Sequence, residues 1–175
     1  MRKLQLFSLF LLALPATLPA QIKWMNWEEA MERMEEEPRK MMLDVYTDWC
    51  NWCKRMDTTT FEHPRIVAYI NEHFYAVKFD AEQRQELSYL GKTYKYVRHG
   101  TRGYHELAAR LLRGRLSYPS VVFLDEKQEI IQSIVGFKTP GQFEVISTYF
   151  GDNQYKKVPW STYKKSYQGY ISDPR

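Results

Sequence analysis

The sequence has few cysteines. Cys50 and Cys53 are the only two among 175 residues, and they lie three positions apart. A disulfide scaffold joins distant segments by several bridges, so that class of protein is excluded. A bridge between such close residues also constrains the unfolded chain very little. The pair is therefore better explained by chemistry than by stability.

Apolar runs long enough to span a membrane are also missing. The run Leu4–Leu14 is shorter than the ~20 residues that a bilayer requires. It follows Arg2 and Lys3 and precedes a region of small residues that ends at Ala20, which is the order of an export signal. We expect residues 1–20 to be a signal peptide and the mature protein to be periplasmic or secreted, with no membrane contact beyond this signal. An uncleaved anchor is the alternative.

The sequence also has only a small net positive charge. Removing Arg2 and Lys3 with the signal lowers the formal net charge from +4 to +2. No Lys/Arg-dense face or recognition motif accompanies this charge, which argues against nucleic acid as a partner. Taking 20 residues from 175 leaves 155, a length typical of one domain with its own core.

A second metal-binding motif is not present. A zinc site needs two ligands besides the cysteines, and the four histidines are scattered. We therefore expect no metal and no other cofactor. Half of a zinc site and a purely structural disulfide are the alternatives. The histidines concerned are His63, His73, His99 and His105.

Helical and strand periodicities alternate along the rest of the chain. Asn26 and Glu29 have the spacing of a capping box, and Thr139 followed by Pro140 is typical of a helix start. The expected elements are a helix from Asn26 to about Pro38, a strand at Lys40–Tyr46, a helix through Met56 that bends near Pro64 and continues to Phe74, strands at Tyr75–Asp80, Ser120–Asp125 and Glu129–Val135, and a last helix to Phe150.

An insertion separates the strand that ends at Asp80 from Pro119. We expect a short strand at Thr93–Val97, a mobile basic loop at Arg98–Gly103 with His99 in it, and a helix at Tyr104–Leu112. The predicted organisation is a signal peptide (1–20), one domain (21–151) with an insertion at about 84–115, and a C-terminal tail (152–175) without a clean period.

The cysteines lie where a strand passes into a helix. Cys50 should occupy the first turn, where unpaired backbone N–H groups stabilise a thiolate. An exposed thiolate attacks disulfides and is also a good leaving group. Cys53, one turn deeper, should be shielded and act as the resolving thiol.

The segment Leu43–Lys54 resembles the active-site segment of thioredoxins. An acid, Asp44, lies inside the strand, a Trp precedes the first Cys and a Lys follows the second. Tyr118-Pro119 and the apolar residues after it resemble the cis-proline loop and its strand. The Trp-Cys-x-Trp-Cys-Lys pattern is similar to that of an exported thioredoxin-like family, over roughly residues 24–150. This resemblance implies an α/β thioredoxin fold, with a central mixed sheet flanked by helices and a helical insertion before the cis-proline strand.

The resemblance also implies roles for particular residues. Asp44 would move a proton to or from Cys53, and its pKa should be raised. Tyr118 and a cis Pro119 would bind substrate together with Trp49 and Trp52. The alternatives are an Asp44 that pairs with a lysine, a trans Pro119, and a Trp49 that serves in packing.

These residues predict a thiol–disulfide oxidoreductase. Asn51-Trp52 is neither the Gly-Pro pair of reducing thioredoxins nor the histidine-containing pair of strong oxidants and isomerases, so the motif leaves the direction of electron flow open. We expect a reductase-like rather than an oxidase-like role. Its partners would be substrate proteins with disulfides or thiols and an unidentified redox partner. The alternative is a thioredoxin-fold module that binds peptides and holds a non-catalytic disulfide.

Overall fold

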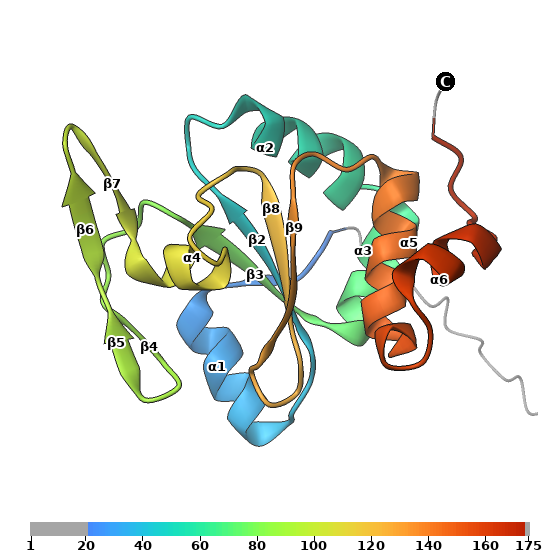
Figure 1. Ribbon diagram of the computed structural model, residues 1–175, viewed down its shortest axis with the longest axis horizontal. Helices are drawn as coiled ribbons and strands as arrows, with labels where there is room; N and C mark the ends of the chain where they lie inside the picture. The colour runs from blue at the N-terminus through green and yellow to red at the C-terminus, as the bar shows by residue number, and fades with distance from the viewer. Residues whose placement is uncertain (1–20, 174–175) are drawn as a thin grey trace, which may run out of the picture.

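The computed structural model describes residues 21–173, so the expected signal at 1–20 lies outside the described residues. A five-stranded mixed sheet with the strand order β1-β3-β2-β8-β9 forms the centre (Figure 1). Helices cover both faces, with α1 and α4 on one and α2, α3 and α5 on the other. Within the described range, no helix has the length and apolar character needed to cross a membrane.

The elements follow the order that the periodicity predicts, with additional short ones. The strands are β1 (Trp24–Met25), β2 (Met41–Tyr46), β3 (Tyr75–Asp80), β4 (Leu87–Tyr89), β5 (Lys92–Tyr94), β6 (Tyr96–His99), β7 (Arg102–His105), β8 (Ser120–Leu124) and β9 (Ile130–Val135). The helices are α1 (Trp27–Glu36), α2 (Asn51–Met56), the π-helical turn η1 (Asp57–Phe61), α3 (Pro64–His73), α4 (Glu106–Leu111), α5 (Pro140–Gly151), the 3-10 turn η2 (Gln154–Lys156) and α6 (Trp160–Ser166).

Strand β2 is the middle of the sheet and carries the site. It pairs in parallel with β3 and antiparallel with β8. Its residues are buried except for Tyr46, as a nearly continuous apolar run predicts for a strand covered on both faces. Asp44 is opposite Lys78 on β3 and Val121 on β8. An ionisable group is thus held in the centre of the sheet.

Two apolar layers hold the helices to the sheet. On one face Trp27 of α1 contacts Phe79 of β3 edge to face, with the ring centroids 6.0 Å apart. On the other, Phe143 of α5 contacts Phe61 in the same manner at 5.4 Å. Buried aromatic pairs add about 0.5–1.5 kcal/mol each to the area that they bury.

The two helix caps predicted from the sequence form to different extents. Thr139 and Gln142 form a reciprocal capping box with Pro140 in the first turn. Asn26 Oδ1 accepts from the Glu29 N–H, but the Glu29 carboxylate pairs with Arg33. The cap at Asn26 therefore has only one of the two hydrogen bonds of a capping box, because the carboxylate of Glu29 pairs with Arg33 one turn further on.

The insertion differs from its prediction. The expected loop at Arg98–Gly103 is wrong, because Arg98 pairs with Gly103 and His99 with Arg102 across the β6–β7 hairpin. Gly100 takes a positive φ of 63° at the first position of the two-residue turn, which suits a tight hairpin. Tyr104 belongs to β7, and the helix begins only at Glu106. Figure 1 shows this hairpin projecting beside the sheet.

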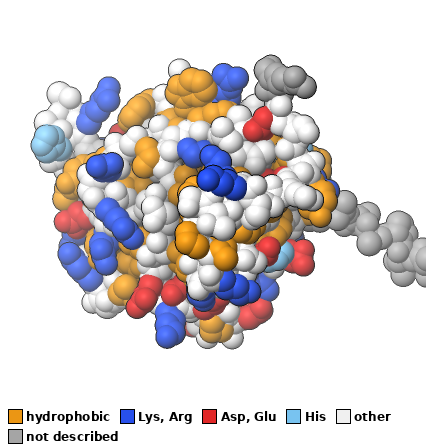
Figure 2. Space-filling model, turned by 45° about the vertical axis from the view of Figure 1, so that its right-hand side comes forward, with side chains coloured by type: hydrophobic (Ala, Val, Ile, Leu, Met, Phe, Trp, Pro, Cys, Tyr) orange, Lys and Arg blue, Asp and Glu red, His pale blue; other side chains and the backbone are white. Residues whose placement is uncertain are grey.

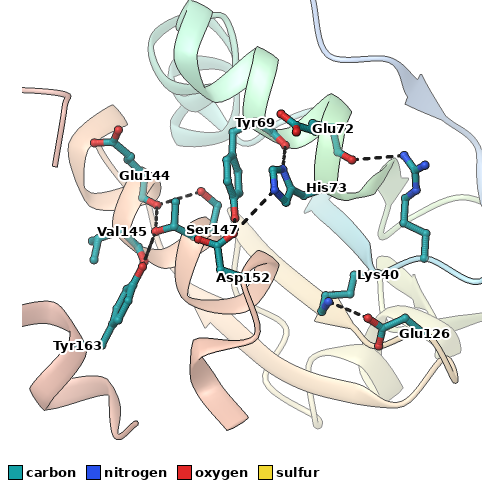
Figure 3. A network of polar contacts seen from close by, with 12 residues as sticks. Lys40, Tyr69, Glu72, His73, Glu126, Glu144, Val145, Ser147, Asp152 and Tyr163 are labelled. Atoms are coloured by element: carbon teal, nitrogen blue, oxygen red, sulfur yellow. Dashed lines mark hydrogen bonds and ion pairs between the residues drawn. The ribbon is translucent and has the colours of Figure 1, made fainter. Parts of the chain in front are cut away.

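The C-terminal segment, left unassigned from its pattern, packs against α5. Tyr163 of α6 donates a hydrogen bond to Thr148 Oγ1 at 3.1 Å. At the end of α5, Asp152 accepts a 2.7 Å hydrogen bond from Tyr69 of α3 (Figure 3). The segment thus extends the helical layer on this face of the sheet.

Candidate functional site

The two cysteines lie where β2 passes into α2. Cys50 is the N-cap residue, and its Sγ accepts a 3.1 Å hydrogen bond from the Cys53 N–H. The two side chains form a disulfide. Cys53 is 2% exposed, as expected for the deeper position, but Cys50 is only 5% exposed. The expectation of an exposed Cys50 is wrong for this oxidised state, because its sulfur turns into the helix and is bonded to Cys53.

Asp44 is a buried carboxyl group, 1% exposed. Its Oδ2 accepts a 2.6 Å hydrogen bond from Lys78 Nζ, while its Oδ1 has no hydrogen-bond partner among the described residues. Burial raises the pKa of Asp44 to about 6, although the charge and hydrogen bond of Lys78 act in the opposite direction. The raised pKa expected for Asp44 is thus found, and so is the lysine partner that belonged to the alternative interpretation.

Lys78 is shared between two carboxylates. Its Nζ also donates to Asp57 Oδ1, which the turn η1 brings to the same side of β3. Burial alone would lower the pKa of Lys78, but Asp44 and Asp57 together raise it. The ammonium group further lies over the ring of Tyr46 at 5.0 Å. The lysine is thus held as a cation beside the buried acid.

The loop before β8 carries the expected proline. The Tyr118–Pro119 peptide bond is cis. The Tyr118 ring contacts Trp49 edge to face at 5.9 Å, which joins this loop to the residue before Cys50. Burial raises the pKa of Tyr118 to about 12, with a further contribution from Glu82 and Asp80. Tyr118 is therefore neutral at physiological pH.

The two tryptophans beside the cysteines face solvent, at 53% exposed for Trp49 and 54% for Trp52. Trp49 Nε1 donates a 3.0 Å hydrogen bond to Glu82, and Arg102 lies over its ring. Trp52 packs beside Phe137 at 5.4 Å. Aromatic surface therefore flanks the disulfide on both sides.

A family model named Thioredox_DsbH, described as a protein of unknown function, DUF255, matches residues 7–137. This range covers both cysteines, the buried acid and the cis-proline loop. The chain belongs to this family. Thioredox_DsbH membership agrees with the resemblance that the active-site segment carries.

Solved structures similar to this Thioredox_DsbH chain show the thioredoxin fold. A thioredoxin-fold protein from Helicobacter pylori has a TM-score of 0.59 and 18% identity, covering 86% of this chain and 93% of its own. A protein titled DsbH oxidoreductase has a TM-score of 0.50 and 19% identity, covering 95% of this chain and 96% of its own.

Curated relatives match shorter segments. The thiol:disulfide interchange protein DsbD of Photorhabdus laumondii is 35% identical over 48 residues, which are 27% of this chain and 8% of that protein. The chain matches about a tenth or less of the length of the curated relatives, including an uncharacterised Caenorhabditis elegans protein at 10%.

Several residues of the site were not singled out from the sequence. Lys78 is the lone basic residue in the apolar strand Tyr75–Asp80, and this is a signal that could have found it. Asp57 and Phe137 carry no comparable signal, because turns remote in sequence bring them to their partners. Arg55 follows Trp52 by three positions in α2, and this helical spacing is a signal that could have found it. Asp44 makes its hydrogen bond to Lys78, and no hydrogen bond joins it to either cysteine in the described part of the chain.

The histidines have individual places in the fold. His105 is buried, caps α4 and lies 2.9 Å from the Gln85 carbonyl, and burial lowers its pKa. His73 stacks on Tyr69 at the end of α3. Over residues 21–173, no three His, Cys, Asp or Glu side chains are grouped so as to hold a metal ion.

Proposed function

We propose that this protein is an exported thiol–disulfide oxidoreductase that exchanges electrons with disulfides of substrate proteins through Cys50 and Cys53. The observation that carries the proposal is the position of Cys50 at the start of α2, where its Sγ accepts the Cys53 N–H. A backbone donor at a helix start stabilises a thiolate, the attacking form in exchange. Family membership and the partial match to a thiol:disulfide interchange protein support it further.

The exchange has two steps. In the reduced protein, the Cys50 thiolate attacks one sulfur of a substrate disulfide, forms a mixed disulfide and releases the other substrate sulfur as a thiolate. The Cys53 thiolate then attacks Cys50 Sγ, restores the disulfide seen here and releases the first substrate sulfur. Two electrons pass from the protein to the substrate, whose two thiolates take up protons. A dithiol donor must then reduce the protein again.

Asp44 is assigned the proton transfer that the second step requires. Cys53 is buried and must lose its proton before it attacks. A carboxyl group with a pKa of about 6 is ionised at neutral pH and can still be protonated at little cost. Asp44 Oδ1 has no hydrogen-bond partner among residues 21–173, and this supports the assignment, since the oxygen can accept a proton.

A reducing direction is supported by the surroundings of Cys50. Strong oxidants have highly stabilised thiolates. Among the described residues, the sulfur of Cys50 has one hydrogen-bond donor, the Cys53 N–H, and no histidine lies between the cysteines. Modest stabilisation of the thiolate favours the disulfide form of the protein, and hence the transfer of electrons to a substrate.

The substrate is proposed to lie across Trp49, Trp52, Tyr118 and Pro119. Exposed aromatic rings bury apolar area without loss of much side-chain entropy. Since Trp49 contacts Tyr118 directly, the loop of Pro119 and the residue before the nucleophile present one surface. The proposal that the protein is exported is based on the sequence pattern of residues 1–20 alone.

The test is reduction of insulin by the purified chain in the presence of dithiothreitol, together with a redox titration against glutathione. We expect activity in the parent, none in Cys50→Ser, and trapped mixed disulfides in Cys53→Ser, because the resolving thiol is missing. Ser117→Ala, an exposed change in the loop before Tyr118, is the matched control and should behave as the parent. Activity retained in Cys50→Ser would refute the assigned nucleophile.

The low exposure of Cys50 favours the peptide-binding module as the second candidate. A module of this kind would keep its disulfide across the glutathione titration and would bind peptides equally well in the Cys50→Ser/Cys53→Ser variant. An oxidoreductase would show a reversible two-electron equilibrium, which separates the two.

A further inference from the structure

Each of the two exposed tryptophans beside the disulfide has an arginine over its ring. The guanidinium carbon of Arg102 is 5.4 Å from the centroid of Trp49. The guanidinium carbon of Arg55 is 5.2 Å from the centroid of Trp52 and 5.6 Å from that of Phe137. Contacts of this kind hold a guanidinium group flat against an aromatic surface.

Neither arginine forms an ion pair within residues 21–173. The carboxylate that follows Arg55 in the helix, Asp57, is bound to Lys78. Guanidinium N–H groups that face solvent are well suited to a carboxylate, which they can bind through two parallel hydrogen bonds. Both arginines are therefore available to a binding partner.

The two aromatic groups belong to one surface. The Gly136 N–H donates a 2.8 Å hydrogen bond to the Pro119 carbonyl, which joins the cis-proline loop to the turn that carries Phe137. In Figure 1 the tip of the β6–β7 hairpin and the β9–α5 turn lie on opposite sides of the start of α2. Figure 2 shows hydrophobic and basic side chains next to each other along this upper edge, whereas most acidic side chains in view lie lower.

The two sides differ in charge. Glu82 bonds to Trp49 Nε1, so the side of Arg102 holds charges of both signs. Beside Phe137 lies Lys138, whose Nζ donates to the Gly136 carbonyl, so the side of Arg55 is basic. A carboxylate is thus attracted most strongly to the surface of Trp52, Phe137 and Arg55.

We propose that the surface of Trp52, Phe137 and Arg55 selects substrate segments in which an apolar residue and a carboxylate lie next to the reactive cysteine. The rings receive the apolar side chain, and Arg55 binds the carboxylate beside it. Such selection rests on the exchange reaction proposed above and adds the class of substrate to it.

The test uses disulfide dimers of one symmetric peptide, X-Leu-Cys-Leu-X, in which X is Glu, Gln or Lys. The protein is reduced beforehand, and a single turnover is followed by chromatography of quenched samples. Each rate is divided by the rate of the same peptide with dithiothreitol, which corrects for its intrinsic reactivity. We expect the Glu peptide to react about twofold to fivefold faster than the Gln peptide, the range for one exposed charge pair, with a smaller ratio at high salt. The Lys peptide should be slowest.

Variants separate a contact from a general effect of charge. Arg55→Met should abolish the preference for Glu, Arg55→Lys should retain part of it, and Arg55→Glu should reverse it. Lys127→Glu, an equal change of charge on the exposed β8–β9 turn, is the matched control and should keep the preference. Arg102→Met should have a smaller effect than Arg55→Met, because Glu82 already lies at that ring.

Equal corrected rates for the three peptides would overturn the proposal. So would an equal loss of preference in Lys127→Glu and Arg55→Glu, because the effect would then come from net charge alone. If the parent exchanged with none of the peptides, the oxidoreductase function itself would fail, and the selection with it.

Discussion

Asp44 should make the folded protein less stable as the pH rises. Its pKa is raised by burial from 3.8 to about 6 in the folded state. Between these values the folded chain keeps a proton that the unfolded chain has released, so stability falls with increasing pH. This contribution is fully present below about pH 4 and is lost as the pH passes through about 6.

The magnitude follows from the shift. One pKa unit corresponds to about 1.36 kcal/mol, and the 2.2 units between 3.8 and 6 therefore correspond to about 3 kcal/mol. Asp44→Asn removes the titration but keeps an oxygen that can accept from Lys78. The amide N–H that it introduces adds a cost that does not depend on pH, so this cost cancels when one pH is compared with another.

The assay is urea unfolding of the oxidised protein at several pH values from 4 to 8. We expect the free energy of unfolding of Asp44→Asn, relative to the parent, to rise by roughly 2–3 kcal/mol across this range, slightly less than the full amount because the unfolded carboxyl is already partly ionised at pH 4. Glu32→Gln, the same change of a carboxyl group to an amide at an exposed position of α1, is the control and should keep the pH dependence of the parent. A constant difference between Asp44→Asn and the parent would refute the reasoning, because Asp44 would then titrate alike in both states.

Three further outcomes are expected. Asp57→Asn should lower the pKa of Asp44, because the charge of Asp57 raises it. A carboxyl titration followed by NMR would then show a midpoint at lower pH, and an unchanged midpoint would argue against a lysine shared by the two carboxylates. Gly151→Ala should cost about 1–3 kcal/mol in urea unfolding, since its Cβ would lie 2.3 Å from Tyr69 Oη, and Tyr69→Phe should recover part of this loss. Asp173→Ala should cost about 1–2 kcal/mol, because this carboxylate accepts from Thr139 Oγ1 and the Gly141 N–H; a thermal melt equal to that of the parent would contradict this.

Local patterns were enough to predict the order of the main elements. The strand at Tyr75–Asp80 has the bounds expected from its apolar run, and the last helix begins at Thr139 and Pro140 as its capping pattern predicts. Both signals act within a few residues of the chain, so they can be read without knowledge of distant partners. The position of Cys50 at a helix start is predictable for the same reason.

Sequence patterns did not predict the elements whose structure depends on contacts with other segments of the chain. The expected loop at Arg98–Gly103 is a hairpin, whose pairing gives no strong alternation in such a polar stretch. The C-terminal helix Trp160–Ser166 has no clean period, since its aromatic residues follow the surface of α5.

The chemistry of the site divides in the same way. Four neighbouring residues of one segment, Cys50 to Cys53, predict the disulfide that the structure contains, because the spacing of the two thiols along the chain is enough to form their bond. The charged neighbours of Asp44 come instead from two other elements, since β3 supplies Lys78 and η1 supplies Asp57. A pKa depends on burial and on charges within a few ångströms. These are set by how strands and turns pack, which a linear pattern does not contain.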